Sequence, residues 1–191
     1  MKKMTTLYKK DPNDLGRVIN EVNPENYWVF EVGTAIPTRK FDGTACAIIN
    51  GELYKRYDAK IDKNTGKYKK PLPNNIIECC GADIDSGHHP HWMKCFRDNP
   101  ADKYHFIGFD SLKNKHDGTY ELCGEKVQGN PENIIGHELI RHGSQRLNLE
   151  DFGFNSVRDY LLTHDIEGIV FHDKFNNRMC KIRKSDFGIK R

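Results

Sequence analysis

The stretch Arg39-Lys-Phe-Asp-Gly-Thr-Ala-Cys-Ala-Ile-Ile-Asn-Gly-Glu52 predicts a β-hairpin and places Lys40 just before it. Its apolar run, residues 45–49, is followed by Asn50-Gly51 and then by an alternating segment, residues 52–58. Asn-Gly between two such runs is a strong hairpin signal, because both residues accept the left-handed conformation that a two-residue turn needs. We therefore expect antiparallel strands at residues 44–49 and 52–58.

The rest of the chain predicts more strands and a few helices. Residues 155 and 156 (Asn and Ser) are candidate caps for a helix that runs to about His164. Residues 62–75 and 81–100 contain glycine and proline breaks and are expected to be a loop and an irregular segment. Further strands are expected at residues 27–32, 104–109 and 119–127, and a second hairpin at 166–172 and 178–183 across Asn176-Asn177. The fold class is therefore α+β, with antiparallel sheets and flanking helices.

Composition favours an ordinary globular protein. A length of 191 residues predicts a single domain over residues 1–191, and a net charge of +3 is too mild to demand nucleic acid. Neither a signal peptide nor a membrane span is evident, so we expect a monomer in the cytoplasm, or in the host cytoplasm if the sequence is viral. The six cysteines are then expected to be reduced, with Cys46, Cys123 and Cys180 packed as small apolar groups.

Basic residues gather in one segment. Seven of them fall within sixteen residues: Lys55, Arg56, Lys60, Lys63, Lys67, Lys69 and Lys70. The segment is either a solvated face of the hairpin or a surface that follows the phosphates of a nucleic acid.

Lys40 is the candidate nucleophile. A lysine amine attacks only when it is neutral, and burial or neighbouring positive charge favours the neutral form. Lys181 and Arg183 alternate on a predicted strand and share one face, whereas Lys184 points the other way. If that face turns toward Lys40, the two cations would also stabilise the charge of a phosphoryl transition state. The alternative is an ordinary basic edge strand.

Carboxylates supply the candidate metal ligands. Glu167 precedes an apolar Gly-Ile-Val run, and Asp42 follows Lys40 by two residues. Both suit Mg²⁺, or Mn²⁺ in its place, together with phosphate oxygens; otherwise Glu167 is a solvent-facing residue at a strand start. Glu121 lies between Tyr120 and Leu122, so its side chain should leave one face of a sheet and either accept a ribose hydroxyl or pair with a basic neighbour.

These elements, in this order, resemble the covalent nucleotidyltransferase superfamily of ligases and mRNA capping enzymes. The resemblance covers roughly residues 27–190. It equates Lys40 through Gly43 with the first motif of the superfamily, and Arg56 with the arginine on the following hairpin strand. Glu121 stands for the glutamate of the third motif, Glu167-Gly168 for the fourth, and Lys181 with Arg183 for the fifth, where Lys-x-Lys is more familiar.

Local phrases resemble the single-domain auto-adenylating RNA ligases found in vertebrates. They are Gly87-His-His-Pro-His-Trp92, Asp117-Gly-Thr-Tyr-Glu-Leu-Cys-Gly124, His137-Glu-Leu-Ile-Arg-His-Gly143 and Cys180-Lys-Ile-Arg-Lys-Ser-Asp-Phe-Gly188. The resemblance implies a ligase-type adenylyltransferase domain without an OB-fold domain, since eight residues follow Arg183. It implies that Lys40 forms a lysyl-AMP from ATP, that the AMP moves to an RNA 5′-phosphate, and that an RNA 3′-hydroxyl displaces it. It also implies that Asp42, Gly43, Arg56, Glu121, Glu167, Lys181 and Arg183 bind the nucleotide.

Two further points stay open. His142 or His137 occupies the place of the aromatic residue that stacks on the adenine in the superfamily, although both are equally explained as surface histidines. The segment from Glu78 to Cys95 holds three cysteines and three histidines, so Cys79, Cys80, His88, His91 and Cys95 are candidate ligands of a zinc-stabilised nucleic-acid-binding module. A capping-type enzyme that transfers GMP to RNA is the other alternative.

Overall fold

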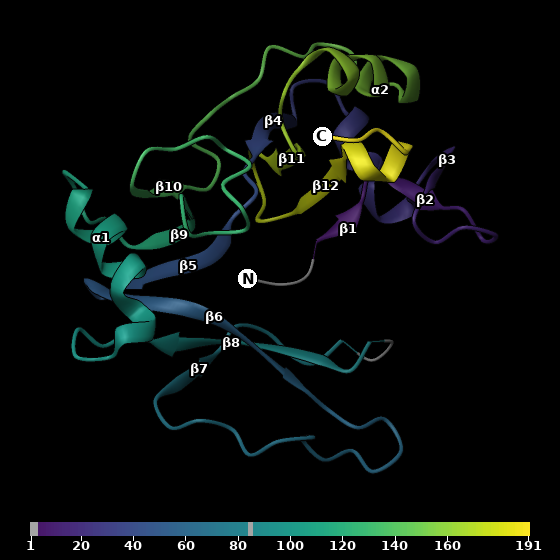
Figure 1. The fold of residues 1–191 in the computed structure, drawn as a ribbon. Helices are drawn as coiled ribbons and strands as arrows, with labels where there is room; N and C mark the ends of the chain where they lie inside the picture. Colours follow the sequence, from purple (N-terminus) through teal and green to yellow (C-terminus); the bar gives the residue numbers. More distant parts are fainter. Residues whose placement is uncertain (1–3, 84–85) are drawn as a thin grey trace. The chain divides into compact units, whose positions relative to one another are not determined.

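The computed structural model describes residues 4–83 and 86–191. The described chain forms two compact units, here called the six-stranded unit (residues 42–142) and the four-stranded unit (residues 4–41 and 143–191). Nearly all strand pairs are antiparallel and only a few helices accompany them, so the predicted α+β class is confirmed at this level (Figure 1).

The four-stranded unit is built on a sheet that joins distant parts of the chain. Its strand order is β1 (Thr5–Thr6), β12 (Met179–Arg183), β11 (Gly168–Asp173) and β4 (Ala35–Lys40), and only the β1–β12 pair is parallel. A separate antiparallel pair joins β2 (Tyr8–Lys10) to β3 (Val18–Val22). The helices are η1 (Pro24–Phe30), α2 (Phe154–Thr163) and η3 (Lys184–Phe187).

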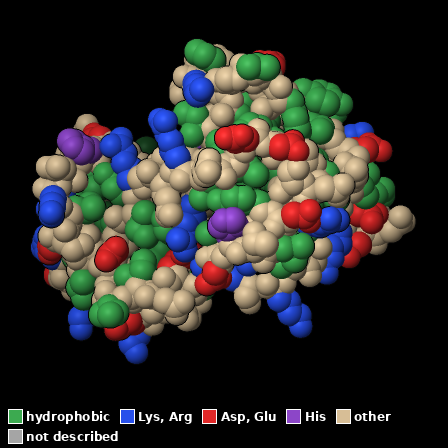
Figure 2. All heavy atoms as spheres, turned by 90° about the horizontal axis from the view of Figure 1, so that it is seen from above, with side chains coloured by type: hydrophobic (Ala, Val, Ile, Leu, Met, Phe, Trp, Pro, Cys, Tyr) green, Lys and Arg blue, Asp and Glu red, His purple; other side chains and the backbone are tan. Residues whose placement is uncertain are grey.

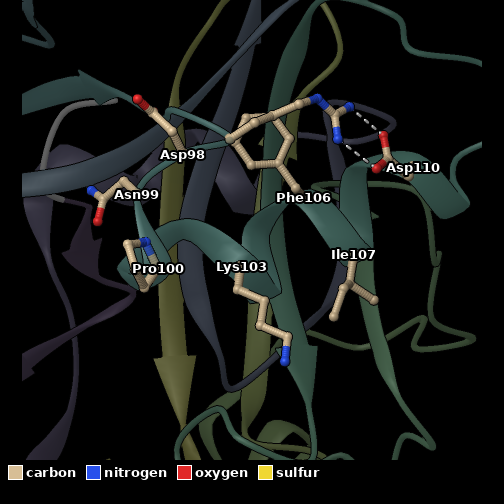
Figure 3. A pocket seen from close by; sticks show the side chains of 8 residues that line it. Asp98, Asn99, Pro100, Lys103, Phe106, Ile107 and Asp110 are labelled. Atoms are coloured by element: carbon tan, nitrogen blue, oxygen red, sulfur yellow. Dashed lines mark hydrogen bonds and ion pairs between the residues drawn. The ribbon is translucent and has the colours of Figure 1, made fainter.

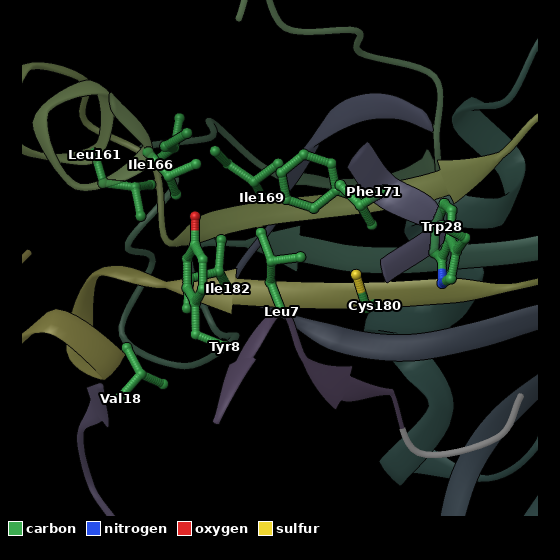
Figure 4. Packing of buried hydrophobic residues seen from close by; sticks show 12 residues of the cluster. Leu7, Tyr8, Val18, Trp28, Leu161, Ile166, Ile169, Phe171, Cys180 and Ile182 are labelled. Carbon is green, nitrogen blue, oxygen red and sulfur yellow. The ribbon is translucent and has the colours of Figure 1, made fainter. Parts of the chain in front are cut away.

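One face of this sheet carries the core of the unit. Ile169 and Phe171 of β11 and Cys180 and Ile182 of β12 have no exposed surface, and Leu161 of α2 packs in the same cluster (Figure 4). Because side chains alternate along a strand, the residues between these apolar ones point to the opposite face. The core therefore determines which residues of β11 and β12 face away from it.

The six-stranded unit has a second core of its own. Phe109 of α1 packs with Ile48, Leu53 and Leu122 of the sheet. The helical elements are η2 (Pro100–Asp102) and α1 (Lys103–Ser111). All strand pairs are antiparallel, in the order β10 (His137–Arg141), β9 (Gly118–Gly124), β5 (Thr44–Ile49), β6 (Glu52–Lys60), β8 (His88–Lys94) and β7 (Ile76–Glu78).

Both predicted hairpins are confirmed. Strands β5 and β6 pair across Asn50 and Gly51, whose φ angles of 52° and 75° are left-handed as the turn requires. Strands β11 and β12 pair across the predicted Asn176-Asn177 turn. The predicted strand at residues 119–127 is present as the shorter β9.

Two predicted strands are helical instead. Residues 27–32 fall largely in η1, where Pro24 occupies the first turn and the Asn23 side chain accepts a hydrogen bond from the Glu25 amide. Residues 104–109 lie in α1, where Phe106 and Phe109 are spaced three apart and turn their apolar rings to one side. Short apolar runs do not distinguish strand from helix by periodicity, which is why both predictions were wrong.

Other boundaries also differ from the prediction. The segment 81–100 was expected to be irregular, but it contains β8. This strand pairs with β6 on one side and β7 on the other, although it includes Pro90. Helix α2 begins after Gly153, and Ser156 donates to Asp151 rather than capping the helix. Strand β4, which ends at Lys40, was not predicted at all.

The cysteines follow the prediction made for them. All six are free, and Cys46, Cys123 and Cys180 are buried. Burial raises the pKa of the Cys46 and Cys180 thiols above the ordinary value, so they stay neutral and pack as apolar groups. Among the helices of residues 4–83 and 86–191, none has the length and apolar character to cross a bilayer.

Candidate functional site

Three predicted cations lie on the same face of the four-stranded sheet, opposite its core. Lys40 and Arg183 both pair with Gly168, one from β4 and the other from β12. Lys181 lies two residues before Arg183 and therefore on the same face. Residue 168, between Lys40 and Arg183, must be glycine, because a Cβ there would lie 2.3 Å from the Ile182 carbonyl oxygen.

Lys40 and Glu167 form an ion pair at the edge of this face. The Lys40 Nζ donates to Glu167 Oε2, and a longer contact of 3.4 Å joins the same Nζ to the Phe41 carbonyl oxygen. About a fifth of each side chain is exposed, 21% for Lys40 and 20% for Glu167. The pair is therefore partly sheltered yet open to a ligand, and Glu167 lies against the predicted nucleophile rather than in bulk solvent.

Lys181 sits in a strongly positive environment. Burial lowers its pKa from the ordinary lysine value, and the positive charges of Arg183 and Lys40 lower it further. Glu167 and Asp186 act in the opposite direction but do not cancel the shift. A negatively charged group on this face would relieve the repulsion among these cations, which makes the face suited to a phosphate.

Asp186 holds Arg183 in place. Its side chain is fully buried and accepts hydrogen bonds from the Arg183 amide at 2.9 Å, from Arg183 Nη2 at 3.0 Å and from Lys10 Nζ at 2.7 Å. Burial opposes ionisation, yet the bonds from Arg183 and Lys10 prevail and lower the pKa of Asp186. The same bond raises the pKa of Arg183. The guanidinium is thus permanently charged and fixed in direction.

Two more polar residues belong to this face. Thr38 of β4 donates to the Val170 carbonyl oxygen at 3.1 Å, and its Oγ1 lies 3.1 Å from His172 Nε2. Sequence reasoning missed both, together with Asp186 and Lys10. The available signal was positional, because Thr38 lies two residues before Lys40 along β4, and His172 lies four residues after Gly168 along β11.

The six-stranded unit brings together a second group of predicted residues. Glu121 Oε2 lies 2.8 Å from His142 Nε2, and the other ring nitrogen of His142 lies 3.0 Å from Thr119 Oγ1. The sequence left two interpretations of Glu121, a contact to a ribose hydroxyl or a pairing with a basic neighbour. In the structure, His142 is the basic neighbour. His142 is fixed by these contacts, whereas His137, the alternative stacking residue, is itself stacked on Tyr104 at 4.3 Å.

Arg56 lies on the same face of the six-stranded sheet as Glu121. Ala47 pairs with Tyr54 on one side and with Thr119 on the other, and Arg56 and Glu121 are each two residues further along. The Arg56 guanidinium contacts Asp58 Oδ1 at 2.8 Å and lies over the Trp92 ring at 5.7 Å. The small β5 residues between the two strands keep this part of the face shallow.

Gly43 has a packing role. A Cβ at this position would lie 2.2 Å from the Leu122 carbonyl oxygen, so no larger residue fits. The Asp42 amide donates to Glu132 Oε1 at 2.9 Å. Asp42 belongs to the six-stranded unit and Glu167 to the four-stranded unit, with the boundary directly after Phe41.

The donor atoms present suit magnesium better than zinc. Within residues 4–83 and 86–191, no three His, Cys, Asp or Glu side chains are placed to hold a metal. Magnesium needs only one or two carboxylates when phosphate oxygens and water complete its shell, and Glu167 is such a carboxylate. Glu167, beside Lys40, is the carboxylate of this face that could hold such an ion together with phosphate oxygens.

The zinc alternative finds little support in the segment that suggested it. His91 Nδ1 lies 2.8 Å from the His89 carbonyl oxygen. In the metal-free protein, burial raises the pKa of Cys79, and it raises that of Cys95 to about 12. Cys80 and His88 belong to the same segment, in which residues 84–85 lie outside the described part of the chain.

A pocket of about 330 Å³ lies elsewhere in the six-stranded unit (Figure 3). Arg97 spans it with two bonds to Asp110, of 2.9 and 2.7 Å, and lies 4.4 Å from the centre of the Phe106 ring. The Arg97 guanidinium is thus already neutralised by Asp110. The lining residues are Arg97, Asp98, Asn99, Pro100, Lys103, Phe106, Ile107 and Asp110, and none of them was a predicted site residue.

Basic and acidic side chains are interspersed over the face shown in Figure 2. The candidate site takes its positive character from Lys40, Lys181 and Arg183 on one sheet face.

No protein-family model matches this chain, and no curated protein sequence matches it. A function for the chain is therefore argued from its motifs and from the geometry of the two groups of residues described above.

Proposed function

We propose that this protein is an ATP-dependent RNA ligase that joins 5′-phosphate and 3′-hydroxyl ends through a covalent lysyl-AMP. The observation that carries the proposal is the convergence of Lys40, Lys181 and Arg183 on one sheet face, with Glu167 paired to Lys40. A lysine beside a carboxylate, facing two further cations across a glycine, suits nucleophilic attack on a phosphate.

In the first step, the Lys40 Nζ attacks the α-phosphorus of ATP. A nitrogen–phosphorus bond forms, the bond from that phosphorus to the bridging oxygen breaks, and pyrophosphate leaves with the electron pair. The amine loses its proton to become a phosphoramidate. Lys181 and Arg183 would neutralise the charge on the α-phosphate, and Asp186 keeps the guanidinium of Arg183 aligned throughout.

Glu167 has two partners in this scheme. Without nucleotide its carboxylate pairs with the Lys40 ammonium. Mg²⁺ bound to ATP would supply charge neutralisation at the phosphates and draw on the same carboxylate. Glu167 would hold that ion, and its carboxylate also lies beside the Lys40 amine.

The later steps use the same residues on an RNA substrate. The AMP moves from Lys40 to the RNA 5′-phosphate, with the amine as leaving group, and an RNA 3′-hydroxyl then attacks that phosphate and releases AMP. Within the six-stranded unit, Glu121 and Arg56 share one sheet face, and we propose that this face contacts a ribose or phosphate of the substrate. Both residues are already held by neighbours, Glu121 by His142 and Arg56 by Asp58.

The decisive experiment is covalent self-labelling. The protein is incubated with α-³²P-labelled ATP and Mg²⁺ and separated on a denaturing gel, with labelled GTP in a parallel reaction. We expect retained label from ATP, and complete loss of label in Lys40→Ala and Lys40→Arg. Lys174→Ala, which removes an exposed lysine of the same unit, is the matched control and should label normally.

Sealing is then tested by adding a 5′-phosphorylated RNA and looking for circles or joined strands. Undiminished labelling of folded Lys40→Ala would remove the proposal. Label from GTP in place of ATP would favour the capping-type alternative.

A further inference from the structure

The segment that follows β6 forms a second, smaller hairpin, here called the lysine hairpin (residues 60–69). Ile61 and Tyr68 form an antiparallel bridge. On either side, the Lys69 amide donates to the Lys60 carbonyl oxygen and the Asp62 amide to the Lys67 carbonyl oxygen, both at 2.8 Å. The hairpin lies in the blue-teal part of the chain after β6 in Figure 1. Residues 62–75 contain no named strand, as the loop prediction requires, but these contacts give residues 60–69 two distinct faces.

The turn is stabilised by its own acidic residue. The Asp62 carboxylate accepts hydrogen bonds from the Asn64 and Thr65 amides, at 3.0 and 3.2 Å, and these bonds lower the pKa of Asp62. Gly66 adopts a φ of 68°, which completes the reversal. Asp62 lies opposite Lys67, on the face that carries the lysines, and its carboxylate is engaged chiefly by turn amides and in part by the charge of Lys69.

One face of the lysine hairpin concentrates positive charge. Lys60 lies directly opposite Lys69, and Lys67 is two residues from Lys69 and so points the same way. All three residues are exposed. Like charges directly opposite each other destabilise an antiparallel pair. An arrangement that is costly for the free protein is compensated when a chain of phosphates runs along it.

The other face presents an aromatic ring that is locked in position. The Tyr68 hydroxyl lies 2.6 Å from His89 Nδ1, and His89 Nε2 lies 2.9 Å from Glu78 Oε1. The Tyr68 and His89 rings are nearly parallel, with centres 5.7 Å apart. Because its hydroxyl is already bonded, the part of Tyr68 left for a ligand is the ring itself, and 36% of the residue is exposed.

We infer that the lysine hairpin binds a single-stranded segment of RNA that crosses residues 67–69, with Lys60, Lys67 and Lys69 contacting phosphates on one face and a base stacked on Tyr68 on the other. Single-strand binding combines these two parts, a basic track and a stacking ring, and tolerates any sequence because every base has a π face. The inference rests on the proposed function for the identity of the nucleic acid, and it places part of the RNA site away from the residues that react with ATP.

The test measures RNA binding without ATP. Fluorescence anisotropy of a labelled single-stranded RNA is followed with the full-length protein at several salt concentrations. Replacing Lys60, Lys67 and Lys69 together by Gln should reduce the slope of log affinity against log salt by about 2, since each single-strand phosphate contact contributes about 0.7. Tyr68→Leu should weaken binding by about tenfold with the slope unchanged, because a stack is lost and no charge.

Two controls make the comparison specific. Replacing Lys113, Lys126 and Lys174 by Gln removes the same charge from other exposed positions and should leave most of the slope intact. Duplex RNA offers no free base, so Tyr68→Leu should not affect its binding. Circular dichroism of each variant checks that the fold persists.

The outcomes separate this inference from the ligase proposal. Wild-type affinity and slope in both hairpin variants would overturn the inference, whatever the protein does with ATP. Variants that lose binding to phosphatidylserine vesicles but keep RNA binding would also overturn it, since the hairpin would then be a membrane contact. Hairpin-dependent RNA binding in a protein that never self-labels with ATP would support the inference and remove the proposed ligase activity.

Discussion

At the scale of single side chains, burial and ion pairing determine which basic and acidic residues are placed to take part in a reaction. Lys40 and Lys184 are both lysines near a strand end, yet Lys40 pairs with Glu167 at an open face whereas Lys184 is buried. Asp186 lies in the segment 180–188 that contributed to the resemblance, but it was not a predicted site residue. It nevertheless determines where the Arg183 guanidinium points.

Glu167→Gln should strongly reduce self-labelling. The substitution keeps the size of the side chain but removes the charge that pairs with Lys40 and attracts Mg²⁺, so we expect a loss of about tenfold or more. The melting temperature should change little, because a partly exposed ion pair contributes only about 0–1 kcal/mol. Labelling is measured across magnesium concentrations, with the exposed Glu150→Gln as control. Normal labelling of Glu167→Gln at every magnesium concentration would make Glu167 a bystander.

Asp186→Asn should make stability depend less on acid pH. The pKa of Asp186 is lowered in the folded state, so its contribution is complete above the unfolded carboxyl pKa of about 3.9 and is lost as the pH falls through the folded value. Breaking this buried pair should cost about 3 kcal/mol at neutral pH. Urea unfolding should therefore show that the difference in free energy of unfolding between the original protein and Asp186→Asn becomes smaller in the acid range. A difference in unfolding free energy that stays constant with pH would contradict the ionised state assigned to Asp186.

For secondary-structure elements, the alternation along β12 governs the site. Its buried residues, Cys180 and Ile182, anchor the strand on the core, which leaves Lys181 and Arg183 on the face that also carries Lys40. Lys184 begins the next helix and is buried. The register of β12 therefore places Lys181 and Arg183 at the site, whereas Lys184, directly after the strand, is buried.

Lys181→Met and Lys184→Met should separate activity from stability. Burial and the charges of Arg183 and Lys40 lower the pKa of Lys181, so its positive form is unfavourable in the fold. Lys181→Met should therefore lose most self-labelling while keeping or gaining stability. Lys184→Met should lose far less labelling per folded molecule. Labelling is normalised to the folded fraction from urea unfolding, and comparable losses in the two variants would show that this strand register is wrong.

For the molecule, the two units have separate hydrophobic cores. Leu161 and Phe171 belong to one cluster, and Leu122 and Phe109 belong to the other. The chain passes between the units directly after Lys40 and Phe41 and again after His142. The proposed nucleophile and the residues assigned to the ribose are thus carried by different cores.

Leu161→Ala and Leu122→Ala should each destabilise one unit. Both side chains are almost completely buried, so each substitution should cost about 2–5 kcal/mol through lost burial and a cavity. Amide hydrogen exchange should show the loss of protection mainly in β11 and β12 for Leu161→Ala, and in β9 and β5 for Leu122→Ala. Equal loss throughout the chain in both variants would mean that the two cores unfold as one cooperative body.

Turn residues and the alternation of side chains along strands were sufficient to predict the local structure of this protein. Asn50-Gly51 and Asn176-Asn177 marked both hairpins, and the shared face of Lys181 and Arg183 followed from their spacing, because backbone conformation and side-chain direction depend on near neighbours. The pairing of Lys40 with Glu167 joins residues 127 positions apart, and the clamp of Lys10 on Asp186 joins residues 176 apart. Such contacts depend on which strands pair. The sequence of β4, the strand that ends at Lys40, contains no turn or periodic pattern that predicts its pairing with β11. Only the folded sheet assembles these distant residues, since burial of the common core selects the strand order.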